Sequence, residues 1–157
     1  MFKTIAKEFS YAPNDVIPPK EIRSLTGEDV RFICRMVISE MLELASTVTD
    51  GPVKFVKECA EEADLPKKYT GTTEIEKIAA QADAFVDTCY YIGDTSAKIM
   101  GVNLDPVFEI VHQANRNKIG ENGNVIRRND GKLMKPPGWK EPDVVPVIKS
   151  QIENGSW

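Results

Sequence analysis

The feature that most constrains the fold is an apolar side chain that recurs every three or four residues from position 30 to position 48. This spacing places the apolar side chains in one stripe along an α-helix. The stripe consists of Val30, Ile33, Val37, Met41, Leu44 and Val48. We expect Thr26 to cap this helix, which begins near Glu28, and Asp50, Gly51 and Pro52 to end it. A helix with such a stripe has to bury it against another element.

Three further helices are expected. The first covers about residues 53–63, and the second, which is long, covers about residues 73–100 and stops at Gly101. The third covers about residues 105–118, with Asp105 as its cap and Pro106 in its first turn. Four helices of this kind predict an all-α four-helix bundle. One protomer with two long central helices buries little core, so we expect a homo-oligomer, either a homodimer or a dimer of dimers.

Both ends of the chain are expected to be irregular. Over residues 1–25, prolines prevent a continuous helix: Pro13, Pro18 and Pro19. Over residues 120–142, Asn-Gly and Asp-Gly turn signals accompany two short strand-like runs, and a proline-rich stretch follows. We therefore expect a single domain over residues 1–157, with a helical core at about 28–119 and a hairpin-like, proline-rich basic tail at about 120–157.

Charge is distributed unevenly along the sequence. Residues 112–140 contain seven basic and two acidic residues, a net charge of +5, which leaves −9 for the rest of a chain whose total is −4. An acidic body with a basic tail argues against a nucleic-acid partner. It suits a small anionic substrate that also carries a metal ion.

The remaining composition restricts the cofactor and the compartment. Three widely spaced cysteines and one histidine argue against a disulfide framework and a zinc site, so carboxylates would hold any metal, which favours Mg²⁺ or Mn²⁺. No apolar run approaches the roughly 20 residues that span a bilayer. The first residues, MFKTIAKEFSYAPND, lack an apolar signal core. We expect a cytoplasmic protein without a membrane partner.

Two pairs of carboxylates have helical spacing. Glu40 and Glu43 are three residues apart, beside the apolar stripe of the first predicted helix. Asp83 and Asp87 are four residues apart on an otherwise apolar part of the long helix. Two such pairs can form a pocket of four oxygen donors that repel one another unless cations neutralise them, and Mg²⁺ suits such a pocket. The alternative is that these carboxylates are ordinary solvated surface groups.

Four segments follow one another in a specific order: SEMLEL, DAFVDTCYY, DPVFEIVHQANRNK and IRRNDGKLMKPPGW. In this combination the chain resembles the MazG-like and phosphoribosyl-ATP pyrophosphohydrolase-like family of all-α NTP pyrophosphatases. The resemblance covers about residues 29–143. It implies a metal-dependent hydrolase that cleaves a nucleoside triphosphate to the monophosphate and pyrophosphate, with Mg²⁺ as its cofactor or Mn²⁺ in its place.

The resemblance also assigns residues to the metal. In the family, a Glu-Glu-x-x-Glu cluster and a Glu-x-x-Asp pair hold Mg²⁺. Glu40 and Glu43 match the last two positions of the cluster, and Asp87 closes the pair. The resemblance thus implies that these three carboxylates bind metal. A carboxylate that the metal does not fully use, Glu40 or Glu43, would act as the catalytic base.

Two positions depart from the family pattern. Ser39 and Ala84 stand where the family usually has glutamates, so Asp83 has to turn toward the same ions to complete the metal site. The departures motivate a hypothesis from another class, a catalytically inactive nucleotide-binding helical scaffold. A further enzymatic alternative is the hydrolysis of phosphoribosyl-ATP with the same metal apparatus.

The expected substrate-binding residues lie in the fourth predicted helix and the tail. In the family, the residues that match Asn115 and Lys118 contact the nucleotide, the lysine at a phosphate and the asparagine at the sugar or base. In the tail, Arg127, Arg128 and Lys135 could close over the phosphates and stabilise the departing pyrophosphate. The alternative is a solvated basic loop.

Two ring side chains near these residues are interpreted as packing groups. Trp139, in the sequence KPPGW, is expected to anchor the tail rather than stack on a base. His112 is expected to pack between helices with its ring hydrogen-bonded.

Overall fold

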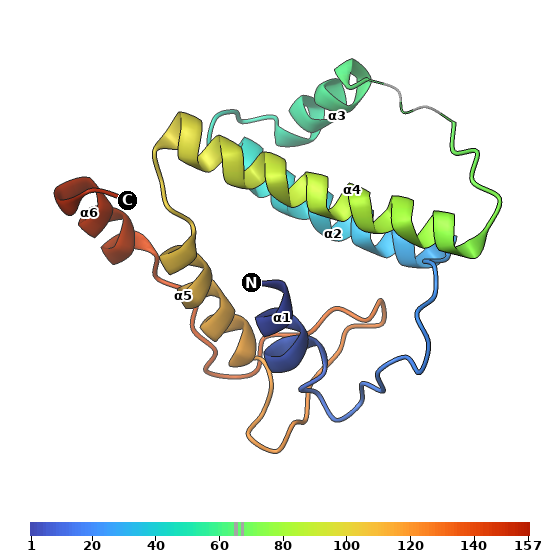
Figure 1. Ribbon diagram of the computed structural model, residues 1–157. Coiled ribbons are helices and arrows are strands. Elements are labelled where there is room, and N and C mark those ends of the chain that lie inside the picture. The colour runs from blue at the N-terminus through green and yellow to red at the C-terminus, as the bar shows by residue number, and fades with distance from the viewer. Residues whose placement is uncertain (65, 67) are drawn as a thin grey trace. The chain divides into compact units, whose positions relative to one another are not determined.

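The computed structural model describes residues 1–64, 66 and 68–157. Its regular elements are α1 (Phe2–Ile5), the π-helical segment η1 (Ala6–Ser10), α2 (Gly27–Ser46), α3 (Pro52–Glu62), α4 (Glu74–Thr95), the π-helical segment η2 (Ser96–Met100), α5 (Asp105–Arg116) and α6 (Val145–Asn154) (Figure 1). Among the described residues, β pairing is limited to one isolated antiparallel bridge between Arg127 and Leu133. The predicted all-α class is confirmed. Within the same residues, no helix combines the length and apolarity needed to cross a bilayer.

Backbone contacts divide the chain into two compact units. One is Arg23–Ala84, and the other combines Met1–Ile22 with Phe85–Trp157. The boundary falls inside α4. The assignment of the whole chain to a single domain stays a prediction, as does the four-helix bundle.

In the unit Arg23–Ala84, α2 starts at the predicted cap. The hydroxyl of Thr26 accepts a hydrogen bond from the Asp29 N–H at 3.2 Å, and the Asp29 carboxylate accepts one from the Thr26 N–H at 2.9 Å. This reciprocal pair is a capping box, which satisfies backbone donors that the first helical turn leaves open. The bonds from Thr26, together with Arg23, lower the pKa of Asp29 to about 2.

The start of α4 is held in the same way and is also tied to the segment before α2. Glu76 and Thr73 form the reciprocal bonds of a second capping box. Gln81 accepts a hydrogen bond from the Leu25 N–H at 2.7 Å and donates one to the Leu25 carbonyl at 3.3 Å. Helix α3, which lies between α2 and α4 in the sequence, contacts α2. Its first residue, Pro52, suits a first helical turn because that turn needs no N–H at this position.

In the other unit, the end of α4 continues as η2 and stops at Gly101, whose positive φ of 70° is the left-handed conformation expected of a terminating glycine. The start of α5 differs from expectation. Asp105 is not the cap but the first residue of the helix, and its N–H donates to the Asn103 side chain at 2.9 Å. An asparagine two residues earlier therefore takes over the capping bond.

The prediction that both chain ends are irregular is wrong in part, because each end contains a helical segment. Residues Phe2–Ser10 are helical, which is possible because the first proline comes only at position 13. The C-terminal part of the proline-rich tail forms α6, with Pro146 in its first turn, where proline is tolerated. Gln151 of α6 exchanges two hydrogen bonds of 2.9 Å with the backbone of Asn103.

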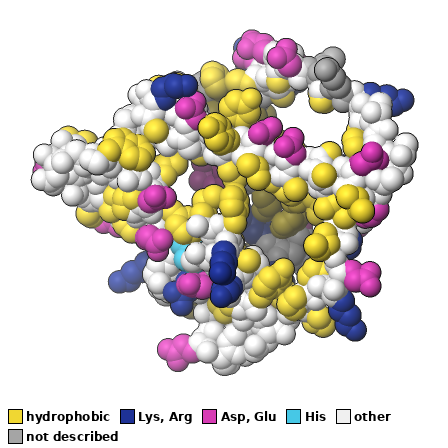
Figure 2. All heavy atoms as spheres, viewed as in Figure 1, with side chains coloured by type: hydrophobic (Ala, Val, Ile, Leu, Met, Phe, Trp, Pro, Cys, Tyr) yellow, Lys and Arg dark blue, Asp and Glu magenta, His cyan; other side chains and the backbone are white. Residues whose placement is uncertain are grey.

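Few apolar side chains are buried in the single chain. Among the described residues, the buried hydrophobic ones are Ala45 and Ala114. Figure 2 shows hydrophobic side chains spread over the visible surface. Large side chains of both long helices remain more than a third exposed, including Val37, Leu44 and Phe85.

The capping box of α2 predicts that the stability difference between the wild type and Asp29→Asn depends on pH. Because the pKa of Asp29 is depressed, its contribution to stability is complete above the ordinary value of 3.8 and is lost as the pH falls toward about 2. The urea midpoint of Asp29→Asn should lie below that of the wild type at pH 6, and the gap should close toward pH 2. Glu28→Gln, at an adjacent first-turn position, serves as the control and should show a smaller gap. A gap that does not change with pH would contradict the assignment.

Candidate functional site

The candidate site is built around the end of α5. The Ala114 carbonyl is one of the last four of the helix, which have no acceptor role within it. It accepts a hydrogen bond of 2.7 Å from the Trp139 indole N–H. Since Ala114 is only 6% exposed, this bond satisfies an acceptor that water reaches poorly. Trp139 therefore anchors the tail on α5, as predicted.

The local sequence explains why the indole reaches this carbonyl. The backbone N–H of Trp139 donates a hydrogen bond to the Pro136 carbonyl at 3.0 Å, and this bond closes a four-residue turn. Pro137 and Gly138 occupy its central positions, and Gly138 has a φ of +79°. Proline followed by a glycine with positive φ is the sequence that a type II turn requires. The turn ends on Trp139 and so directs the chain back toward α5.

Two lysines lie against the same ring. The Lys118 ammonium is 5.3 Å and the Lys135 ammonium 4.5 Å from the ring centroid of Trp139, both within the range of cation–π attraction. The Asn115 side-chain oxygen accepts a hydrogen bond of 2.7 Å from Lys118. We call Asn115, Lys118, Lys135 and Trp139 the Trp139 cluster. It brings together three of the five predicted substrate-binding residues.

The Trp139 cluster contains two ammonium groups that lie against one ring. The Glu141 carboxylate is 3.0 Å from Lys135. Cationic side chains attract phosphate oxygens. Lysine ammonium groups with three donors each can bind them from several directions.

The other two predicted substrate-binding residues lie in a short hairpin of the tail. Arg127 and Leu133 form the isolated antiparallel β-bridge. The backbone N–H of Arg128 donates a hydrogen bond to the Lys132 carbonyl at 2.9 Å. Gly131, with a φ of +89°, takes the left-handed position that such a three-residue loop needs. The Arg128 guanidinium is paired with Asp130 of the same loop, so that arginine supports the turn.

Arg127 has a partner that the sequence did not reveal. Its guanidinium forms two hydrogen bonds to the Asp15 carboxylate, the one from Nη2 at 2.9 Å. These bonds hold the pKa of Asp15 below its usual range. Asp15 lies in the proline-containing segment that we expected to be irregular, and no spacing or periodicity there indicated a role.

His112 packs in the same unit, as expected, but its ring is only partly satisfied. It is 5% exposed and stacks on Phe108 with the ring centroids 5.3 Å apart. Its Nε2 has no hydrogen-bond partner among the described residues and lies 3.6 Å from a Glu8 carboxylate oxygen. The same oxygen is 3.1 Å from Arg116. The N-terminal π-helical segment therefore covers His112 with an acidic side chain.

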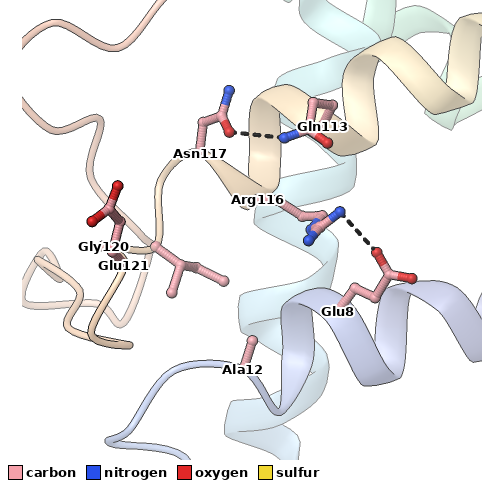
Figure 3. A pocket seen from close by; sticks show the side chains of 8 residues that line it. Glu8, Ala12, Gln113, Arg116, Asn117, Gly120 and Glu121 are labelled. Carbon is pink, nitrogen blue, oxygen red and sulfur yellow. Dashed lines mark hydrogen bonds and ion pairs between the residues drawn. The ribbon is translucent and has the colours of Figure 1, made fainter.

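A hollow of about 280 Å³ adjoins this ion pair. Figure 3 shows Arg116 directed at Glu8 and Gln113 hydrogen-bonded to Asn117, the latter at 2.9 Å. These polar groups already bind one another. None of the predicted site residues lines the hollow.

The four predicted metal ligands lie on the two long helices. Glu40 and Glu43 belong to α2, and Asp83 and Asp87 belong to α4. Across residues 1–64, 66 and 68–157, no three histidine, cysteine, aspartate or glutamate side chains are arranged to hold a metal ion. The metal site and the catalytic base stay predictions.

Similarity to known proteins is visible in the fold. No protein-family model matches the chain, and no curated protein matches it significantly. A solved structure, described as a "putative NTP pyrophosphohydrolase" from Exiguobacterium sp. 255-15, superimposes with a TM-score of 0.71. The two sequences are 23% identical, and the similarity covers 97% of this chain and 93% of the other. The chain thus has the fold of that protein over nearly its whole length.

The anchoring bond of Trp139 predicts a loss of stability. Trp139→Phe retains an aromatic ring but leaves the Ala114 carbonyl without its donor, which should cost about 1–3 kcal/mol. Trp157→Phe is the matched control, because Trp157 is 82% exposed at the C-terminus. The free energy of unfolding, measured by denaturant titration at one protein concentration, should fall only for the first variant. Equal values for both variants would show that the bond does not hold the tail.

Proposed function

We propose that the protein is a Mg²⁺-dependent nucleoside triphosphate pyrophosphohydrolase that converts an NTP or dNTP to the monophosphate and pyrophosphate. The observation that carries this proposal is the Trp139 cluster, in which Lys118 and Lys135 lie against one ring and Asn115 accepts a hydrogen bond from Lys118. The resemblance of the ordered segments implies that Asn115 and Lys118 contact the nucleotide. The fold shared with the Exiguobacterium protein, described as a "putative NTP pyrophosphohydrolase", adds support.

The proposed roles follow from the charges of the side chains. Lys118 and Lys135 bind phosphate oxygens and draw electron density from the phosphorus that water attacks. Asn115 holds the Lys118 ammonium through its side-chain oxygen. Glu40 or Glu43 accepts the proton of the attacking water. Arg127 and Arg128 balance the negative charge that develops on the departing pyrophosphate.

The metal requirement rests on the chemistry of four carboxylates, Glu40, Glu43, Asp83 and Asp87. Their oxygens are the ligands that Mg²⁺ prefers, and the ion would supply positive charge next to the triphosphate.

We further propose that the working form is a homo-oligomer, a homodimer or a dimer of dimers. The exposed apolar side chains support this proposal: Tyr90 and Tyr91 of α4 are each 74% exposed, and Leu44 of α2 is 61% exposed. A single chain that leaves such groups in water lacks the burial that stabilises a domain. A second copy of the chain would cover them.

This proposal predicts that the protein does not persist as a folded monomer. Multi-angle light scattering at micromolar concentration should give a mass of at least twice 17.5 kDa. The thermal midpoint should rise with protein concentration, because association stabilises the folded state. A folded 17.5 kDa species with a concentration-independent midpoint would contradict the proposal.

The proposed metal ligands predict a characteristic response to substitution. Glu43→Gln and Asp87→Asn should each lower pyrophosphate release by at least about a hundredfold. Without metal their melting temperatures should equal or exceed that of the wild type, since a repulsive charge is gone, whereas stabilisation by Mg²⁺ should shrink. Glu58→Gln, which removes an exposed carboxylate of α3, is the control and should change neither quantity.

Two results would redirect the assignment. Unchanged turnover in both variants would remove the metal site from these residues. Nucleotide binding by the wild type without turnover in Mg²⁺ would favour the inactive scaffold, which Ser39 and Ala84 motivate. Turnover of phosphoribosyl-ATP in preference to every NTP would select the alternative substrate.

A further inference from the structure

The segment 13–15 is bound closely to the basic tail within one compact unit. The Asn14 N–H donates to the Gly123 carbonyl at 2.9 Å, and the Asn14 side chain donates to the Asn122 carbonyl at 2.6 Å. Gly123 has a φ of +78°, a conformation that residues with a side chain rarely adopt, and a Cβ there would lie 2.5 Å from the Asn14 side-chain oxygen. The next residue, Asp15, is thereby placed at Arg127.

The ion pair between Asp15 and Arg127 uses only part of the guanidinium. Arginine has five N–H donors. Two of them, on Nε and Nη2, bind the two carboxylate oxygens of Asp15, and one on Nη1 binds the Gly131 carbonyl at 3.0 Å. Among the described residues, the other two N–H groups have no acceptor. With 31% of its side chain exposed, Arg127 can offer them to a ligand.

The neighbouring arginine shows why this pair differs from an ordinary turn contact. Arg128 is paired with Asp130, two residues away, so any chain that forms the turn can form that pair. Asp15 is 112 residues from Arg127, and the pair exists only when the N-terminal segment is docked. It fixes an arginine side chain that would otherwise lose several free rotations on binding an anion.

We propose that Asp15 is a positioning residue: it holds Arg127 so that the two remaining N–H groups of the guanidinium bind an oxygen of the pyrophosphate moiety. The inference rests on the proposed function, because it deepens the role of Arg127 there. Asp15 does not touch the substrate and acts through the arginine.

Charge makes the proposal sharply testable. Asp15→Asn removes a negative charge from the surroundings of an anion, so electrostatics alone would tighten the binding of pyrophosphate. Positioning predicts the opposite sign, weaker binding, because the freed arginine has to be ordered by the ligand. If Asp15 had only a structural role, Asp15→Asn would not weaken pyrophosphate binding as long as its melting temperature stayed unchanged.

The experiment measures the binding of inorganic pyrophosphate to the full chain by calorimetry without divalent metal, and NTP turnover in Mg²⁺ in parallel. Asp15→Asn should raise the dissociation constant about three- to tenfold. Arg127→Gln should raise it by about tenfold or more, and the double variant should match Arg127→Gln alone. Glu58→Gln, a neutralised carboxylate of α3, should bind like the wild type. Asp15→Glu, which retains a carboxylate, should bind more tightly than Asp15→Asn.

Each outcome decides the proposal. Tighter or unchanged binding in Asp15→Asn, or additive losses in the double variant, would overturn it, as would a wild type that does not bind pyrophosphate. If Asp15→Asn loses stability, the double variant decides, since only positioning predicts that the loss of affinity caused by Asp15→Asn disappears when Arg127 is already replaced. Weakened pyrophosphate binding in a protein that hydrolyses no NTP would uphold the anion site and refute the proposed reaction.

Discussion

The apolar stripes of the long helices are the main constraint on the structure, because the single chain leaves them partly exposed. Val37 and Leu44 of α2 and Phe85 of α4 all remain more than a third exposed. The rest of the structure depends on polar contacts that hold segments in place without a large core: two capping boxes and the side chains of Gln81 and Gln151, each bound to both polar groups of one backbone residue. Such contacts specify geometry, while burial of the stripes would supply most of the stabilisation.

The Trp139 cluster shows how local sequence rules bring two cationic side chains together at one ring. Helix α5 leaves a carbonyl open at its end, a proline-glycine turn brings Trp139 to it, and the ring attracts two lysines. Every step uses a short-range preference of the chain. The two lysines are therefore held in place by the fold itself. If they bind phosphate as proposed, this order would lower the entropic cost of binding.

The apolar periodicity, together with capping residues and terminating glycines, predicted helix boundaries at positions where these signals are strong. Thr26 and Gly101 lie where they were expected, because capping oxygens and left-handed glycines act locally. Prolines misled us at the two ends, since Pro146 fits a first helical turn and the initial helix ends before Pro13. Lys118 and Lys135 could be proposed from charge and resemblance. The anchoring role of their partner Trp139 could be predicted from the proline-glycine sequence before it. The role of Asp15 could not be predicted, because a contact across 112 residues leaves no local signal in the sequence.

We propose that this chain hydrolyses nucleoside triphosphates to monophosphate and pyrophosphate. The most direct test of this proposal is a panel of NTPs and dNTPs, with phosphoribosyl-ATP included, incubated with the purified protein at several Mg²⁺ concentrations. Monophosphate and pyrophosphate would be quantified together. We expect equal amounts of both products, released only with Mg²⁺ or Mn²⁺ present. Orthophosphate as the product, or no product from any substrate that binds, would contradict it.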